Sequence, residues 1–171
     1  MVEIKPLTPD EWRLLKEVRI AALGEAPYAF TSRLDDALQR SDEDWVRLSE
    51  HYSGDPNSVT FFAFENKSPC GMSACVLEAE EAEMLAVWVD PAHRGKGVGN
   101  ALIEYALTWS RSRGAKRLKV GVFEDNLNAV AFYRSAGFKD VGLTKPELSS
   151  EERTVMLLSM DLQENANRAG G

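Results

Sequence analysis

The sequence predicts a mixed α/β fold of the α+β class, in which a mostly antiparallel sheet is flanked by helices. Helical patterns come early in the chain, and the order β-β-β-α-β-α-β-β follows. The strand–helix–strand unit over 84–123 needs a crossover connection, so we expect its two strands to be parallel neighbours. With 171 residues, 44% of them apolar, the chain predicts one domain over 1–162. We expect the small, polar segment 163–171 to be disordered.

The N-terminal third is predicted to be mainly helical. A short strand at 4–7 precedes a helix whose apolar residues form one stripe and which ends near Gly24. The segment 34–52 predicts one or two further helices, divided near 41–44, where the sequence Ser-Asp-Glu-Asp resembles a capping box.

The rest of the chain alternates strand and helix patterns. The segment 84–89 is apolar on both faces, which is typical of a central strand. The helix after it carries apolar residues at i, i+3, i+4, i+7, i+8 and i+11, so one stripe faces a core. We predict strands at 59–65, 71–77 and 84–89, a helix at 97–113, a strand at 118–123, a helix at 126–136, and strands at 138–143 and 154–162.

Charge and composition exclude several classes of protein. A net charge of −7 argues against a general nucleic-acid binder, although it would attract a cationic partner such as an amine. No apolar run is long enough to span a bilayer and the first residues do not resemble a signal peptide, so we expect a cytoplasmic protein. Cys70 and Cys75 are five positions apart in one strand, which predicts opposite faces and neither a disulfide nor a shared metal. No Cys/His cluster is present, so we expect no metal site.

A glycine-rich loop lies between the predicted central strand and its helix, with the sequence Arg94-Gly95-Lys96-Gly97-Val98-Gly99. Glycine allows positive φ and close approach of a ligand, and the first N–H groups of a helix have no partner within it. Together with two cations these features predict a phosphate-binding site. Asn100 breaks the dinucleotide-binding fingerprint, and Asp90 and Gly97 break the P-loop pattern. A tight turn without a ligand is the alternative.

A second motif spans 126–138. In a helix, Asn126, Ala129 and Tyr133 fall on one stripe, and the small residue between two polar ones leaves room for a ligand. On its own, the pattern is more typical of an N-cap asparagine and a core tyrosine.

Both motifs resemble those of the GNAT family of N-acetyltransferases. That family carries Gln/Arg-x-x-Gly-x-Gly/Ala at the first junction, matched by Arg94, Gly97 and Gly99, and Asn-x-x-Ala-x-x-x-Tyr-x-x-x-Gly-Phe at the second, matched throughout. The resemblance implies the GNAT fold, acetyl-CoA as acyl donor and no metal. It implies that main-chain N–H groups of Arg94, Gly95, Lys96, Gly97, Val98 and Gly99 hold the pyrophosphate of coenzyme A. Main-chain groups of Val87 and Val89, in the central strand, would pair with the pantetheine arm, and Asn126 would contact this arm. Tyr133 would lie near the thioester sulfur as general acid.

Glu83 is a candidate general base. It lies eleven positions before Arg94, a spacing at which some members of the family carry a catalytic glutamate. An amine is protonated near pH 7 and must lose a proton before it attacks a carbonyl carbon, which a carboxylate could accept directly or through water. A solvated charge at a strand edge, like Glu80 and Glu81, is the alternative. His93, beside the loop, is expected to be a surface residue.

The resemblance predicts acetyl transfer to a primary amine by direct attack, with the oxyanion stabilised by a main-chain N–H near Val89. The acceptor would be a small-molecule or peptide amine, walled by residues 19–32 and the helices up to Tyr52. A homodimer is common in the family. Two alternatives remain open: a non-catalytic coenzyme A-binding module, and an acyltransferase that acts on a hydroxyl or uses a longer acyl chain.

Overall fold

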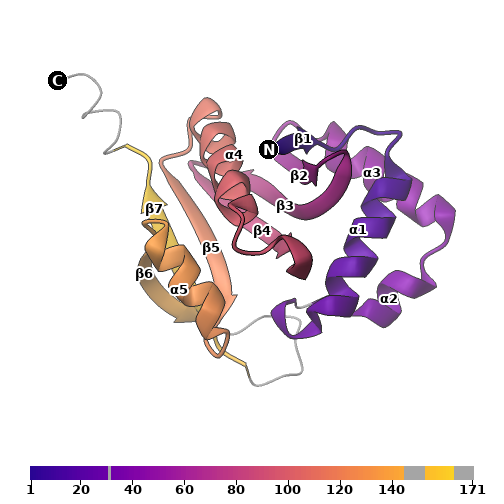
Figure 1. Ribbon diagram of the computed structural model, residues 1–171. Helices are drawn as coiled ribbons and strands as arrows, with labels where there is room; N and C mark the ends of the chain where they lie inside the picture. Colours follow the sequence, from indigo (N-terminus) through magenta and orange to yellow (C-terminus); the bar gives the residue numbers. More distant parts are fainter. Residues whose placement is uncertain (31, 145–152, 164–171) are drawn as a thin grey trace.

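A seven-stranded sheet runs through the molecule, and helices cover both of its faces (Figure 1). The computed structural model describes residues 1–30, 32–144 and 153–163, so most of the predicted tail lies outside the described residues. The helices are α1 (Trp12–Glu25), α2 (Leu34–Gln39), α3 (Asp42–Gly54), α4 (Val98–Ser112) and α5 (Leu127–Ser135), with 3-10 turns at Pro27–Ala29 and Pro91–His93. The strands are β1 (Val2–Pro6), β2 (Ser58–Glu65), β3 (Ser68–Glu78), β4 (Glu81–Val89), β5 (Arg117–Phe123), β6 (Lys139–Thr144) and β7 (Val155–Asp161).

The sheet has the predicted mixed, mostly antiparallel character. Its strand order is β1-β2-β3-β4-β5-β7-β6, and the pair β4–β5 is parallel while every other neighbouring pair is antiparallel. This confirms that the two strands joined by α4 are parallel neighbours. The capping box is also confirmed, because Ser41 accepts a hydrogen bond from the Asp44 N–H and the Asp44 carboxylate accepts one from the Ser41 N–H.

The sheet separates two hydrophobic cores. Adjacent side chains on a strand point to opposite faces, so Phe61 packs into the core under α4 and Phe62 into the core under α1 and α3. Both rings are fully buried. In Figure 1, α4 crosses the front of the strands and α1, α2 and α3 form a group to the right. The core under α4 also holds Val130 and Tyr133 of α5.

Two irregularities in strand pairing shape the centre of the sheet. Gly71 pairs with Ala63 while Pro69 pairs with Phe64, which leaves Cys70 as an extra residue in β3. This bulge reverses the simple alternation, so Cys70 and Cys75 both point into the core under α4. The prediction of opposite faces is therefore wrong, and both thiols are free and buried.

The second irregularity lies in β4. Met72 pairs with Trp88 and Ala74 with Leu85, so two residues of β4 oppose Ser73 alone. One of the two, Ala86, has φ 53°, a left-handed conformation that non-glycine residues seldom adopt. The bulge bends β4, and the pairing of β4 with β5 ends just before it, at Met84 and Val120. The second halves of these neighbouring strands therefore lie apart.

Candidate active site

A cleft of about 570 Å³ opens where β4 and β5 separate. One wall comes from the second halves of β4 and β5 and from α5, and the other comes from the helical segments before β2. The candidate site residues Glu83, Val87, Asn126 and Tyr133 all line it. Val89 and the loop over 94–99 do not belong to this lining.

The separation leaves one edge of β4 without a partner strand. The Asp90 N–H donates to the Cys70 carbonyl of β3 at 2.8 Å. Main-chain groups alternate between the two edges of a strand, so the N–H groups of Val87 and Val89 face the gap toward β5. An extended ligand could pair with this edge as an added strand would. The Val89 carbonyl already accepts a hydrogen bond from Arg94 Nε at 3.1 Å. Of the two main-chain groups of Val89, the N–H is therefore the one that a ligand could bind.

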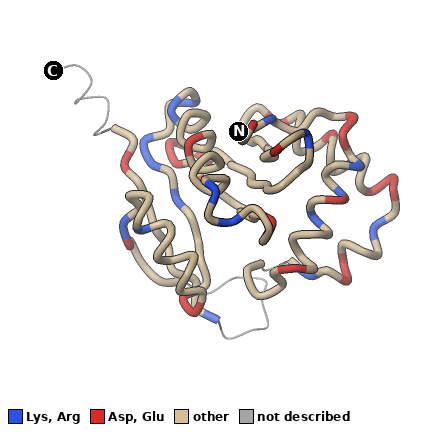
Figure 2. Tube along the Cα trace, viewed as in Figure 1, with Lys and Arg blue, Asp and Glu red and all other residues tan. Residues whose placement is uncertain are grey.

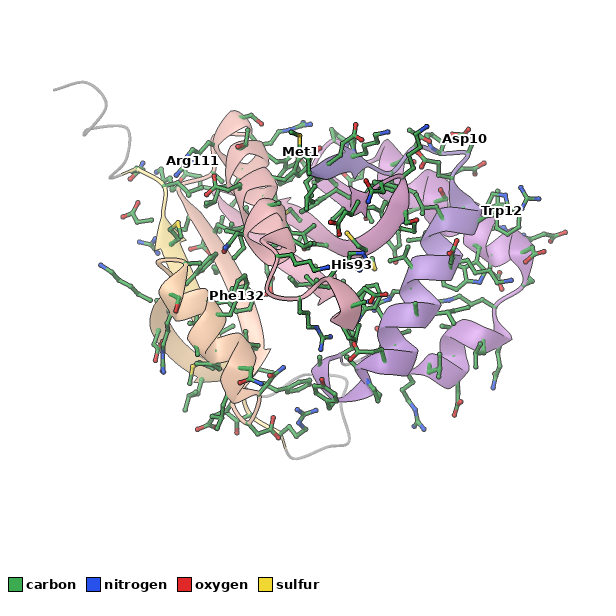
Figure 3. The ribbon with its side chains drawn as sticks, in the orientation of Figure 1. Met1, Asp10, Trp12, His93, Arg111 and Phe132 are labelled. Carbon is green, nitrogen blue, oxygen red and sulfur yellow. The ribbon has the colours of Figure 1, made fainter. Side chains whose placement is uncertain are left out.

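The glycine-rich loop has the left-handed backbone that its sequence predicts. Gly95 has φ +76° and Gly97, the N-cap of α4, has φ +88°. Among the described residues, and apart from the glycines and their chain neighbours, no atom lies within 4 Å of an ideal Cβ at either position, so the space beside both residues is open. Gly99 serves packing instead, because a Cβ there would lie 2.8 Å from Cζ of Phe132, which α5 directs toward α4 (Figure 3). The exposed start of α4 can therefore receive a phosphate between its free N–H groups and the open glycines.

The two cations of the loop behave differently. The guanidinium of Arg94 is bound within the protein, since its Nη2 donates to Glu25 Oε2 at 2.8 Å. Glu25 Oε2 also accepts from Nε1 of Trp88 at 2.8 Å, so the end of α1 is tied to both β4 and the loop. Lys96 is exposed and forms no ion pair within the described part of the chain. Of the two, Lys96 is thus the side chain that remains available to a phosphate.

The second motif combines a helix cap with a buried phenol. The Asn126 side chain accepts a hydrogen bond from the Ala129 N–H at 3.3 Å and caps α5, and it also lines the cleft. Tyr133 is 4% exposed and packs edge-on against Phe132 and Phe138. Burial raises the pKa of Tyr133 well above that of an ordinary phenol. Burial therefore favours the protonated hydroxyl over the phenolate.

Glu83 differs from the acidic residues beside it. Glu80 pairs with Lys116 at 2.6 Å, and Glu81 pairs with Lys119 at 2.9 Å. Glu83 is half-buried, lines the cleft, and forms no ion pair with any residue that the structure describes. Lys119 lies opposite Glu83 in the parallel pair. Its ammonium group donates a hydrogen bond to Glu81, and the charge of Glu83 adds to the rise in its pKa. A carboxylate that faces a cleft without a fixed partner is free to accept a proton.

His93 lies away from the cleft, at the end of the turn after β4 (Figure 3). Its Nε2 is 3.2 Å from Glu65 Oε2 and its Nδ1 is 3.7 Å from Asp90 Oδ1, so it is half-buried between two carboxylates rather than a surface residue. Over residues 1–30, 32–144 and 153–163, no group of three His, Cys, Asp or Glu side chains could hold a metal ion. In the same ranges, no helix has the length and apolar character needed to cross a membrane.

Sequence reasoning named the wall of the cleft only as a range and missed its polar side chains. Arg19 of α1, Arg40 between α2 and α3, and His51 and Tyr52 of α3 all line the cleft opposite β4. Lys/Arg and Asp/Glu are interspersed along α1, α2 and α3, so no block of one charge marks these positions (Figure 2). Burial of Arg19 was the one signal that could have distinguished it, and burial arises from tertiary packing.

Known proteins share both the sequence pattern and the fold. The family model "Acetyltransferase (GNAT) family" matches residues 25–138. An uncharacterized N-acetyltransferase, MJ1207 of Methanocaldococcus jannaschii, is 34% identical over 101 residues, which cover 54% of this chain and 45% of that protein. This chain thus spans less than half the length of that relative. The N-alpha-acetyltransferase RimI of Mycobacterium tuberculosis is 31% identical over 137 residues, which cover 75% of this chain and 82% of RimI.

The fold resembles a solved structure of yncA, a putative acetyltransferase from Salmonella typhimurium with its cofactor acetyl-CoA. The TM-score is 0.73 over 95% of this chain and 94% of that one, at 17% sequence identity, so this likeness concerns the fold alone. The family match covers the separated β4 and β5, the glycine-rich loop and α5. From sequence and fold together, the chain belongs to the GNAT family of acetyltransferases.

Proposed function

We propose that this protein transfers an acetyl group from acetyl-CoA to a primary amine. The observation that carries the proposal is the unpaired edge of β4, which leads from the cleft toward the open glycines at the start of α4. In this proposal, N–H groups of Arg94 to Gly99 and the Lys96 ammonium hold the pyrophosphate. Main-chain groups of Val87 and Val89 pair with the pantetheine arm, and Asn126 contacts it from α5.

The chemistry proposed for this cleft is direct attack. Glu83 accepts a proton from the ammonium group of the acceptor, directly or through water, and the free amine attacks the thioester carbonyl. A main-chain N–H of the strand near Val89 stabilises the oxyanion that forms. The carbon–sulfur bond then breaks and Tyr133 donates its proton to the departing thiolate, while the proton released by the attacking nitrogen restores the phenol, directly or through water. An ordinary thiol has a pKa near 8.5, so this protonation assists the step without being indispensable.

Similar proteins support an amine as acceptor. MJ1207 is named an N-acetyltransferase and RimI an N-alpha-acetyltransferase, so both names specify an amine nitrogen. A hydroxyl acceptor or a longer acyl donor would give a different product, which the following test distinguishes.

The test is product analysis by mass spectrometry. The full chain is incubated with acetyl-CoA and with a panel of amines that includes amino acids, polyamines, aminoglycosides and peptides. The proposal predicts an acetylated amine and an equal amount of free coenzyme A, and little product from longer acyl donors. Products acylated on a hydroxyl, or binding of coenzyme A with no transfer to any member of the panel, would overturn it.

A further inference from the structure

Arg19 is a cation on the helical wall of the cleft for which the fold supplies no anionic partner. Its guanidinium stacks on the ring of Phe30, with Cζ 5.0 Å from the ring centroid. Its Nη1 atom is buried and has no hydrogen-bond partner among the described residues. In the same ranges, no carboxylate lies within ion-pair distance of Arg19. An arginine that only supported the fold would be expected to have such a partner.

The surroundings of Arg19 increase the cost of this arrangement. Burial lowers its pKa, and the neighbouring guanidinium of Arg40 lowers it further, while Tyr52 acts in the opposite direction. Arg40 itself stacks on Trp45 and lies in the field of Asp44, whose carboxylate is bound to the Ser41 N–H. A buried cation without a hydrogen-bonded partner is destabilising. An anion that entered the cleft would remove this cost.

Two carboxylates line the same cleft. Glu83 lies on β4, and Asp55 lies at the end of α3. The cleft is therefore cationic at Arg19 and Arg40 and anionic at Glu83 and Asp55, in a protein whose overall net charge is −7. Such a distribution complements a molecule that carries both charges better than a polycation.

We propose that the acceptor is a small amine that also carries a carboxylate, such as an amino acid, and that Arg19 binds this carboxylate. This inference rests on the proposed acetyl transfer and specifies its substrate class. The planar guanidinium presents two parallel N–H groups that match a carboxylate, and the stacked Phe30 fixes its plane. The amine of the same molecule then lies toward Glu83.

Matched acceptors test the substrate class. Each free amino acid is compared with its neutral carboxamide and with the amine that its decarboxylation gives, all at saturating acetyl-CoA. The wild-type protein is expected to use the best amino acid with a kcat/KM at least about tenfold higher than its carboxamide, because only the acid can pair with Arg19. The decarboxylated amine is expected to be poorer still, since it places no anion at the guanidinium.

Two variants test the residue. Arg19→Met removes the guanidinium and keeps an unbranched side chain, and it should raise KM for the amino acid about tenfold or more with little change in kcat. Its rates with the carboxamide should stay near those of the wild type. Arg13→Met is the matched control: Arg13 lies on the same helix and stacks on Trp12, outside the cleft, and the change should alter neither acceptor.

Thermal unfolding separates a binding role from a structural one. If Arg19 binds the carboxylate of the acceptor, Arg19→Met should keep or raise the Tm of the protein without ligand. An amino acid at millimolar concentration should then raise the Tm of the wild type but not of the variant. A marked loss of Tm in Arg19→Met would identify a structural arginine and overturn the inference. So would equal use of acid and carboxamide by the wild type, or a preference for acids that survives in Arg19→Met. Preferred acetylation of decarboxylated amines would refute the inference alone, whereas acetylation of no amine would refute the proposed function itself.

Discussion

The two walls of the cleft are built in different ways. On the donor side, the features that would hold the cofactor are main-chain groups: the free edge of β4, the left-handed glycines and the open start of α4. On the acceptor side, they are side chains from separate helices, such as Arg19 and Tyr52. A site built from main-chain groups requires glycines and a helix N-terminus at fixed positions, so it produces a motif that can be recognised in the sequence. A side-chain site leaves no such motif, because any helix can present a cation.

The largest expected effect concerns Glu83, which lines the cleft from β4. Glu83→Gln removes the proposed base and keeps the size of the side chain, so kcat should fall by about 10² or more. Binding of coenzyme A, measured by calorimetry, should remain nearly intact. The matched control is Glu80→Gln, which alters an exposed ion pair only. A Glu83→Gln variant with near-normal kcat at every pH would show that Glu83 is merely a charge at the strand edge.

Substitutions of Tyr133 test the proposed general acid on the donor side of the cleft. Tyr133→Phe removes the hydroxyl and keeps the ring, so kcat should fall by roughly ten- to a few hundredfold while the Tm stays close to that of the wild type. Tyr133→Ala should instead destabilise the fold by about 3 to 5 kcal/mol, because it empties a packed position. If Tyr133→Phe is fully active, solvent protonates the thiolate and the residue belongs only to the core.

The raised pKa of Tyr133 gives a further check on pH. Burial disfavours the phenolate, so the folded protein holds the proton at pH values where an unfolded tyrosine near pKa 10 would begin to lose it. The wild-type kcat should therefore show no decline from tyrosine ionisation between pH 8 and about 10. In that range ultraviolet absorbance should show no phenolate from Tyr133 until the protein unfolds. A phenolate signal from native protein below pH 10, absent in Tyr133→Phe, would contradict this expectation.

The glycine loop offers a matched pair of substitutions. Gly97 and Gly114 flank α4 with φ +88° and +77°, and both have open space where a Cβ would lie. Valine at either position should therefore cause similar backbone strain. Gly97→Val should in addition weaken coenzyme A binding tenfold or more, at least about 1.4 kcal/mol, whereas Gly114→Val should not. Equal affinities for the two variants would refute a phosphate site at the loop.

The smallest expected effect concerns Glu25, which connects the two walls. Glu25→Gln keeps an acceptor for Trp88 but removes a negative charge from Arg94, whose guanidinium could then reach a bound phosphate. Both groups are partly exposed, so we expect coenzyme A affinity to rise by only about two- to fivefold, and less at high salt. A clear loss of affinity would instead mean that Glu25 holds the loop in its binding conformation.

The sequence was informative where local chemistry decides the structure. The order of the elements, the parallel pair and the capping box follow from periodicity, connection rules and hydrogen bonding within a few residues. The glycine loop was predicted for the same reason, because positive φ is restricted almost entirely to glycine. The bulges at Cys70 and in β4 depend on how neighbouring strands pair, and an error of one residue there changed the predicted face of a cysteine.

Tertiary packing decided the remaining features of the site. Arg94 looked like a phosphate ligand, yet α1 brings Glu25 to its guanidinium from sixty-nine positions away. Arg19 was predicted only as the first residue of a range that walls the acceptor, and the contact with Phe30 and the burial of its Nη1 atom distinguish it within that range. Neither contact has a counterpart in local sequence pattern. The motifs therefore predict the donor half of the site residue by residue, whereas they predict the acceptor half only as a range.

The most direct test of direct attack across this cleft is a two-substrate kinetic experiment. Initial rates of coenzyme A release are measured while acetyl-CoA and the best amine of the panel are both varied. Direct attack requires both substrates in the cleft at once, so double-reciprocal plots should intersect, and no acetyl group should remain on the protein when amine is omitted. Parallel lines together with an acetylated protein would show a covalent intermediate and contradict the account.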